Sequence, residues 1–229
     1  MTDCCYKREK KKFLDSTESI TNYSYFLAET MYGGKITARD VLILDEAHNC
    51  ESELSKFIEV IISEKFAKDV LKLAWPTTDN PSKVVEWLTL TYEPALKLHL
   101  DRAQKMIEKL DMKEKIKEFK AISTQVELLD KHICKLHRFL GMWSDENWIL
   151  NVVPAFGAGM RKFEFKPVDV GPYSNELLFK YGKKILMMSA TIVNRDVFCA
   201  TLGIDQNDVA FMSMDSPFPV ENRPIYYAP

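Results

Sequence analysis

Two short apolar runs, far apart in the chain, each end in polar residues. Residues 41–44 (VLIL) precede residues 45–48 (DEAH), and residues 185–188 (ILMM) precede residues 189–191 (SAT). A short, wholly apolar run is typical of a parallel strand that is covered on both faces. Because ligands of open α/β sheets bind outside the carboxyl ends of the strands, we expect the two polar segments to face one crevice.

Between these strands the apolar positions take the period of α-helices. Apolar residues recur in steps of four and three over residues 96–110 and again over 122–140, which predicts two amphipathic helices. Asp111 with Glu114 is typical of a helix N-cap and its reciprocal partner, and Gly141 is suited to end the second helix. The pattern therefore predicts an all-helical insertion with a hairpin that turns near Asp111.

Shorter elements are predicted on either side of this insertion, and together they give an α/β fold class. Prolines and glycines crowded between residues 154 and 172 predict loops and short strands, and the proline-rich tail from residue 216 is linker-like. The remaining predictions are the end of a strand at 19–22, a helix at 23–31 closed by Gly33 and Gly34, and short helices at 175–181 and 197–202.

The composition narrows the class of protein. The 229 residues are 46% hydrophobic and 28% charged, as is ordinary for a soluble chain with a core. A net charge of -2 gives no global positive field, so binding to nucleic acid must be local. No apolar run reaches the roughly 20 residues of a membrane span, and we expect no membrane partner. Five scattered cysteines form no disulfide framework, so we expect a soluble, intracellular protein, cytoplasmic or, in a eukaryote, nuclear.

Asp45 and Glu46 are the candidate chemical groups. Adjacent carboxylates point in different directions, so one can hold a hydrated Mg²⁺ while the other orients and deprotonates a water. Nucleoside triphosphate hydrolysis requires both tasks. His48 is placed to sense the phosphate state and to bond to the hydroxyls of Ser189 and Thr191. In the structural alternative, the two acids only favour the positive end of a helix dipole.

Four segments together resemble the XPD/DinG-like DNA helicases of superfamily two. They are VLILDEAHNCE at 41–51 as motif II, ILMMSATI at 185–192 as motif III, SITNYSYFL at 19–27 and SPFPVENR at 216–223. The resemblance implies a partial RecA-like parallel-sheet motor domain, formed by residues 1–54 and 165–213. It also implies an Arch-like helical insertion at 55–164 and the start of a linker or second motor domain at 214–229.

The resemblance also implies a role for each polar segment. Asp45 contacts Mg²⁺ and Glu46 activates the water that attacks ATP. Asn22 and Tyr23 contact single-stranded DNA, although packing at a strand-to-helix junction explains Tyr23 equally well. Coupling of hydrolysis to translocation along DNA is assigned to His48, Ser189, Ala190 and Thr191.

Two features of the family are incomplete in this chain. Cys4-Cys5-Tyr6 resembles the segment with the fourth cysteine ligand of a [4Fe-4S] cluster, which makes Cys4 the ligand in a longer parent protein. No segment matches the phosphate-binding pattern G-x-x-x-x-G-K-[ST], and residues 33–37 (GGKIT) have the wrong spacing. We therefore expect a fragment of a longer ATP-dependent helicase, inactive alone, whose missing N-terminal and C-terminal parts belong to the same polypeptide.

A function of another class is compatible with part of the pattern. Heptad-like stripes are also found in helical hairpins that dock onto partner proteins. The alternative is therefore a non-enzymatic interaction module, with the hairpin mounted on an α/β scaffold. The acidic pair Asp45 and Glu46 distinguishes the two, because a scaffold has no need for carboxylates at the end of a strand.

Overall fold

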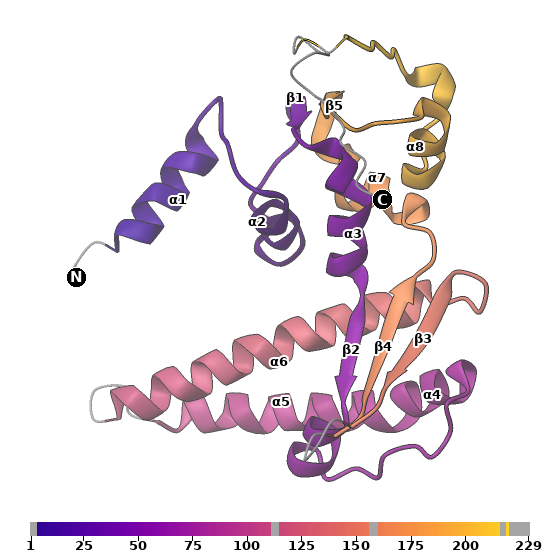
Figure 1. Ribbon diagram of the computed structural model, residues 1–229. Helices are drawn as coiled ribbons and strands as arrows, with labels where there is room; N and C mark the ends of the chain where they lie inside the picture. Colours follow the sequence, from indigo (N-terminus) through magenta and orange to yellow (C-terminus); the bar gives the residue numbers. More distant parts are fainter. Residues whose placement is uncertain (1–3, 111–114, 156–159, 216–218, 220–229) are drawn as a thin grey trace.

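Small β-sheets lie in two separate parts of the chain, as the computed structural model shows (Figure 1). The structure describes residues 4–110, 115–155, 160–215 and residue 219. Within them, β1 (Arg39–Leu44) and β5 (Gly182–Met187) form a two-stranded parallel sheet. The other sheet is antiparallel, with the order β2–β4–β3, and consists of β2 (Val60–Ser63), β3 (Trp148–Val153) and β4 (Lys162–Pro167).

The parallel pair confirms the two strands predicted at 41–44 and 185–188. Val41 pairs with Lys184 and Leu44 with Met187, so both strands run toward the same edge. The expectation that both faces are covered is wrong for the described residues, because Val41 and Ile43 are 53% and 57% exposed. Successive side chains alternate between faces, and only the face with Leu44 packs on the core.

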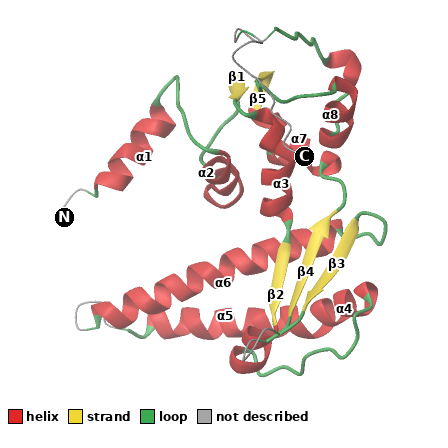
Figure 2. Ribbon diagram, viewed as in Figure 1, coloured by secondary structure: helices red, strands yellow, loops and turns green. Residues whose placement is uncertain are grey.

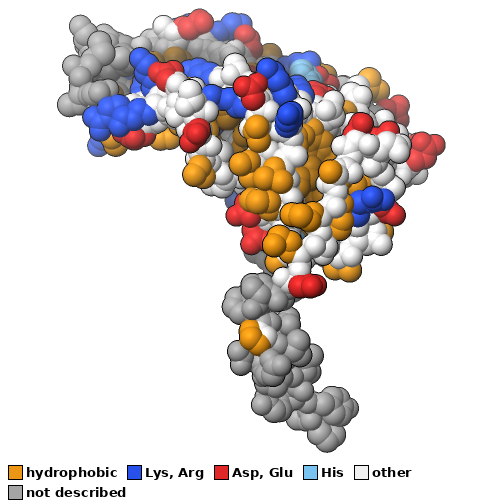
Figure 3. Space-filling model, turned by 90° about the horizontal axis from the view of Figure 1, so that it is seen from above, with side chains coloured by type: hydrophobic (Ala, Val, Ile, Leu, Met, Phe, Trp, Pro, Cys, Tyr) orange, Lys and Arg blue, Asp and Glu red, His pale blue; other side chains and the backbone are white. Residues whose placement is uncertain are grey.

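This bare face, formed by Val41, Ile43, Leu186 and Met188, lies on one side of the molecule. Leu186 is 49% and Met188 is 42% exposed. Viewed from above, hydrophobic side chains gather on the part of the surface over the β1 and β5 end (Figure 3). Such a patch on a parallel sheet is unusual, since parallel sheets are normally covered on both faces.

Helices and loops complete this part of the chain. The predicted helix at 23–31 is confirmed as α2 (Tyr23–Ala28) and a π-helical turn (Glu29–Gly33), closed by Gly34 in the left-handed region at φ 60°. The predicted strand at 19–22 is wrong, because these residues pair with none of the described strands and Ile20 is 98% exposed. The other helices of this part are α1 (Cys5–Asp15), α3 (Cys50–Ile58), α7 (Gly171–Leu177) and α8 (Arg195–Leu202).

The two short helices predicted near the end of the chain are present with shifted boundaries. The helix expected at 175–181 begins earlier, at Gly171, and a 3₁₀ turn follows it at Phe179–Tyr181. The helix expected at 197–202 begins at Arg195, because Asn194 accepts a hydrogen bond from the Val197 amide and caps it. It ends, as predicted, at Gly203, whose φ is 65°.

The predicted hairpin is confirmed as two long helices that pack along each other, α5 (Glu93–Glu108) and α6 (Ile116–Met142). Apolar residues at the predicted positions, among them Leu96 and Leu136, are buried at this contact. Ahead of it lie α4 (Pro81–Trp87) and a π-helical turn at Leu88–Tyr92. Asp111 and Glu114, expected to cap the turn, lie outside the described residues, as do residues 216–218 and 220–223 of the SPFPVENR segment.

The expectation of an all-helical insertion is wrong, because the three-stranded sheet packs on this hairpin (Figure 2). Phe163 and Phe165 of β4 are fully buried: Phe163 stacks on Trp75, with ring centroids 4.3 Å apart, and Phe165 lies 4.6 Å from Phe139 of α6. β4 also spans residues 164 and 165, between which the sequence placed a domain boundary. The described fold is therefore a mixture of helix and two small sheets.

Chain segments cross between the two parts at α3, which leads into β2, and after β4, which leads toward α7 (Figure 1). Lys166 of β4 and Glu59, the residue between α3 and β2, form an ion pair at 3.6 Å across these segments. No helix among the described residues combines the length and the apolar character that a membrane span requires.

Candidate functional site

The polar ends of β1 and β5 lie together. Beyond the last strand pair, the Met188 amide donates to the Leu44 carbonyl and the Ala47 amide donates to the Met188 carbonyl, both at 2.9 Å. His48 Nδ1 lies 2.8 Å from Ser189 Oγ, in a hydrogen bond between residues 141 positions apart. The predicted proximity of the segments 45–48 and 189–191 is therefore confirmed.

The backbone of the acidic turn is strained at Glu46. This residue has φ 49° and ψ 44°, in the left-handed region. For a residue with a Cβ atom this region costs about 1–2 kcal/mol, and such strain tends to cluster at functional sites. The turn continues through a 3₁₀ segment at Ala47–Asn49 into α3.

The two carboxylates of the turn have different partners. Asp45 Oδ1 accepts the Glu46 amide at 2.9 Å, while Glu46 Oε2 lies 3.3 Å from His48 Nδ1. Both side chains are exposed at the end of β1. The two adjacent acids thus face different groups, while their division of labour between Mg²⁺ and water stays a prediction.

A chain of polar contacts leads from Glu46 to the segment after β5. His48 Nδ1 is shared between Glu46 and Ser189. Ser189 Oγ accepts the Thr191 amide at 3.1 Å and lies 3.3 Å from Thr191 Oγ1. Ala190, between them, is exposed and carries no polar side-chain group. Glu46 and Thr191 are therefore connected through the side chains of His48 and Ser189.

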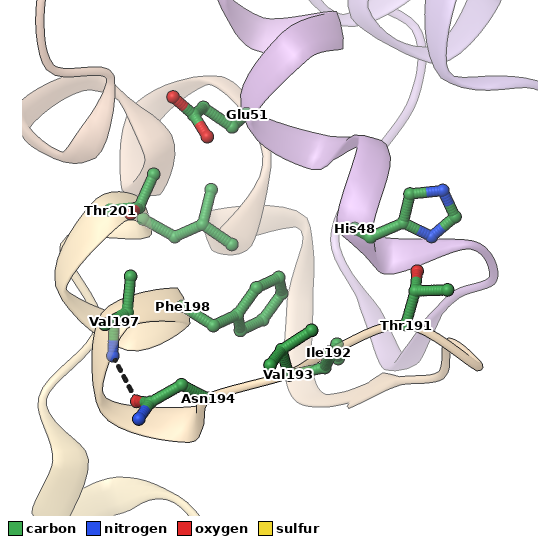
Figure 4. A pocket seen from close by; sticks show the side chains of 10 residues that line it. His48, Glu51, Thr191, Ile192, Val193, Asn194, Val197, Phe198 and Thr201 are labelled. Atoms are coloured by element: carbon green, nitrogen blue, oxygen red, sulfur yellow. Dashed lines mark hydrogen bonds between the residues drawn. The ribbon is translucent and has the colours of Figure 1, made fainter. Parts of the chain in front are cut away.

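A cavity of about 400 Å³ opens beside this chain of contacts (Figure 4). His48 and Glu51 come from the segment after β1, and Thr191 and Asn194 from the segment after β5. The rest of the lining is largely apolar and comes from the stretch that leads into α8 and from α8 itself. Asp45 and Glu46 do not line this cavity, and both are exposed.

Asn22 and Tyr23 both have contacts within the fold. Asn22 Oδ1 accepts the Tyr25 amide at 2.8 Å and so caps α2. The Tyr23 hydroxyl donates to the Asp45 carbonyl at 2.9 Å and accepts a hydrogen bond from Cys50 Sγ at 3.4 Å. Burial raises the pKa of Tyr23 above its ordinary value. The DNA contacts of these two residues stay a prediction.

The link from Tyr23 to Asp45 is a feature that the sequence analysis missed. It depends on how α2 packs beside the acidic turn and on the left-handed backbone at Glu46. No spacing in the sequence signals either property, since the two residues lie 22 positions apart in different elements. The predicted packing of Tyr23 at a strand-to-helix junction was the one hint that it packs inward, although residues 19–22 are not a strand.

A second cavity, of about 340 Å³, lies between α1 and α2. Tyr6, Lys10 and Phe13 line it from α1, and Asn22 and Tyr25 line it from the start of α2. Phe13 and Tyr25 meet edge to face, with ring centroids 6.0 Å apart. The cavity thus combines aromatic rings with a lysine from the basic N-terminal helix.

The described residues differ in how well they fit the expected cofactors. Mg²⁺ keeps most of its waters and takes one or two protein carboxylates besides substrate phosphates, so the exposed carboxylate of Asp45 fits it. A [4Fe-4S] cluster needs four thiolates. Cys4 is exposed at the start of α1, but the described residues contain no group of three or more side chains that could share a metal. Cys4 would supply one such thiolate, and the cluster itself stays a prediction.

Comparison with known proteins assigns no family. No family model matches the chain, and no curated protein is significantly similar to it. The site is accordingly characterised by its own geometry: an acidic turn after β1, joined by His48 and Ser189 to the hydroxyl-bearing segment after β5.

Proposed function

We propose that this chain is part of an ATP-dependent DNA helicase, in which ATP hydrolysis drives translocation along single-stranded DNA. In this proposal it forms part of a RecA-like motor domain, and residues 55–164 form an Arch-like insertion. The observation that carries the proposal is the hydrogen bond between His48 and Ser189, which joins the acidic turn to the segment after β5 at 2.8 Å.

Each polar group then has a task in phosphoryl transfer. Asp45 holds hydrated Mg²⁺, which, when bound, neutralises charge on the phosphates of ATP. Glu46 orients the attacking water and accepts its proton. Because His48 contacts both Glu46 and Ser189, it passes the state of the acidic site to residues 189–191 and so links hydrolysis to movement.

The phosphate-binding loop must come from outside these residues in this proposal. The bare face of the parallel sheet supports that view, since Ile43 and Leu186 are about half exposed, at 57% and 49%. Parallel sheets are normally covered on both faces, and two strands alone are marginally stable. Further strands, the phosphate-binding loop and the other cluster cysteines are therefore proposed to belong to other parts of the same polypeptide.

Single-stranded DNA is proposed to bind near the cavity between α1 and α2. Bases stack on aromatic side chains, and lysines neutralise backbone phosphates. The cavity offers the rings of Tyr6, Phe13 and Tyr25 together with Lys10. The Lys10 ammonium also forms an ion pair with buried Glu29, so a phosphate would share it with that carboxylate. Asn22, which also lines the cavity, adds an amide that can bond to a base or a phosphate.

The acidic pair provides the test of the enzymatic proposal. In the polypeptide that includes the phosphate-binding loop, Glu46→Gln removes the base but keeps the size of the side chain. DNA-stimulated ATP hydrolysis should fall by about 10²–10⁴-fold, the range for loss of a general base. Glu53→Gln is the matched control, because Glu53 lies on α3 and pairs with Lys56. Unchanged turnover in Glu46→Gln would contradict the proposal.

A docking function for the hairpin is the second candidate. Leu98 and Met106 of α5 and Leu128 of α6 are 50%, 55% and 62% exposed, and exposed apolar side chains on helices can anchor a partner protein. This function predicts that Glu46→Gln has no effect, while Leu128→Lys abolishes partner binding. The same two variants therefore distinguish the two candidates.

A further inference from the structure

The peptide group between Asp45 and Glu46 is held at both of its ends. Its carbonyl oxygen accepts the Tyr23 hydroxyl at 2.9 Å. Its N–H donates to Asp45 Oδ1, also at 2.9 Å. These two bonds fix the plane of the peptide group that precedes the Glu46 side chain.

The orientation of this peptide group sets the backbone of Glu46. The left-handed φ of 49° there is unfavourable for a residue with a Cβ atom. Such conformations persist where the surrounding structure over-determines them. If this peptide group rotates as Glu46 returns to ordinary backbone angles, the Asp45 carbonyl turns away from Tyr23 and their hydrogen bond breaks, so the bond opposes that relaxation.

Tyr23 is itself fixed by two helices. It is the first residue of α2, directly after the capping residue Asn22. Its oxygen also accepts a hydrogen bond from Cys50, the fully buried first residue of α3. The hydroxyl therefore links α2, the acidic turn and α3 at one point.

We propose that Tyr23 is a positioning residue for the acidic pair, which acts through the peptide group between Asp45 and Glu46. The catalytic consequence rests on the proposed function, whereas the hydrogen bond itself does not. Asn22, which caps α2, and Tyr25 of α2 also line the cavity beside α1. A ligand in that cavity that moves α2 therefore also moves Tyr23 and the peptide group bonded to it. In this way DNA bound in the cavity would affect the site of hydrolysis.

The hydrogen bond can be tested in the 229-residue chain without any assay of activity. Labelling aspartate carbonyls with ¹³C and glutamate amides with ¹⁵N selects the Asp-Glu peptide groups, which in this sequence are 45–46 and 145–146. Tyr23→Phe should move the cross-peak of 45–46 and leave that of 145–146 in place. In the control Tyr181→Phe, the aromatic ring that packs edge to face on Phe26 is kept, and both cross-peaks should stay in place. A 45–46 cross-peak that does not move in Tyr23→Phe would overturn the proposal.

The positioning role is tested by ATP hydrolysis in the polypeptide that includes the phosphate-binding loop. Tyr23→Phe should lower kcat about three- to tenfold, as expected for loss of one hydrogen bond, and leave KM for ATP unchanged. A loss of folded protein would also lower the apparent kcat at unchanged KM, so kcat is calculated per folded molecule. Tyr181→Phe controls for removal of a tyrosine hydroxyl near α2.

The two proposals fail in different ways. If Glu46→Gln abolishes turnover and Tyr23→Phe leaves kcat unchanged, the positioning role is wrong and the enzymatic function stands. If Glu46→Gln leaves turnover unchanged, the enzymatic function is wrong and the catalytic role of Tyr23 falls with it. A lower kcat in Tyr23→Phe, together with the shifted 45–46 cross-peak, supports the positioning role.

Discussion

His132, in the middle of α6, is held as a neutral side chain by its surroundings. Its Nε2 lies 2.9 Å from the Tyr92 hydroxyl, and the rings of Phe66 and Tyr92 meet it edge-on. Burial, followed by the positive charge of Lys135, lowers the pKa of His132 to about 4. Between that value and the roughly 6.5 of an unfolded chain, the unfolded state binds the proton and the folded state does not.

Stability should therefore depend on pH through this one residue. The contribution of His132 is complete above about pH 6.5 and is lost as the pH falls toward 4, by roughly 3 kcal/mol at most. His132→Gln removes the titrating group, so its free energy of unfolding should fall less between pH 7 and pH 4.5. Urea unfolding at both pH values measures the difference. His99→Gln changes a histidine of α5 that is half-buried and bonds to Gln125 of α6, and this variant should keep the full pH dependence. Equal losses in His132→Gln and the unsubstituted chain would contradict the assignment.

Single residues also show what the sequence reveals about the site. The proximity of Asp45, His48 and Ser189 was predictable, because parallel strands place their polar ends at one edge of a sheet. The bond from Tyr23 to Asp45 was not, since it depends on the packing of α2 and on a left-handed residue. A backbone angle of that kind at a glutamate leaves no trace in composition or periodicity.

At the scale of elements, aromatic residues of β4 pack the antiparallel sheet against the hairpin. Phe163 and Phe165 alternate with exposed or half-buried residues and fill the space above the hairpin. Their partners come from both sides, Trp75 from the chain before α4 and Phe139 from α6. The sheet and the hairpin thus share one core.

Truncation of an aromatic side chain tests this shared core. Phe163→Ala should lower the free energy of unfolding by about 3–5 kcal/mol, because it removes a fully buried ring and leaves a cavity. Ile149 of β3 is 58% exposed, so Ile149→Ala should change the free energy of unfolding by about 0.5 kcal/mol or less. Urea denaturation of the 229-residue chain provides both values, and similar losses in the two variants would show that the sheet does not pack on the hairpin.

The short strands predicted between residues 154 and 172 include β4 (Lys162–Pro167). The lengths of the elements explain why the helices were predictable and β2 was not. α6 spans 27 residues, enough for several turns of the apolar stripe to stand out. β2 spans four residues, and its alternation of buried Val60 and Ile62 with exposed Ile61 is too short to outweigh the helical pattern around it. Its pairing with β4 joins residues about a hundred positions apart, for example Val60 with Phe165, which no local pattern reports.

At the scale of the whole molecule, the described residues cover only one face of the parallel pair of strands. One face packs on the core through Leu44, while Ile43 on the other face is 57% exposed. Exposed apolar patches of this kind mark interaction surfaces. In the proposed helicase, further strands and helices of the same polypeptide cover this face.

A substitution on the bare face tests whether other parts of a longer polypeptide cover it. Ile43→Thr keeps a β-branched side chain, so in the 229-residue chain it should change the free energy of unfolding by about 0.5 kcal/mol or less. In the longer polypeptide it should cost about 2 kcal/mol, because the threonine hydroxyl would be buried without a partner. Ile61→Thr, on a strand of the other sheet and 43% exposed, should have a small effect in both. If Ile43→Thr is equally harmless in the longer polypeptide, no other part of that polypeptide covers this face of the sheet.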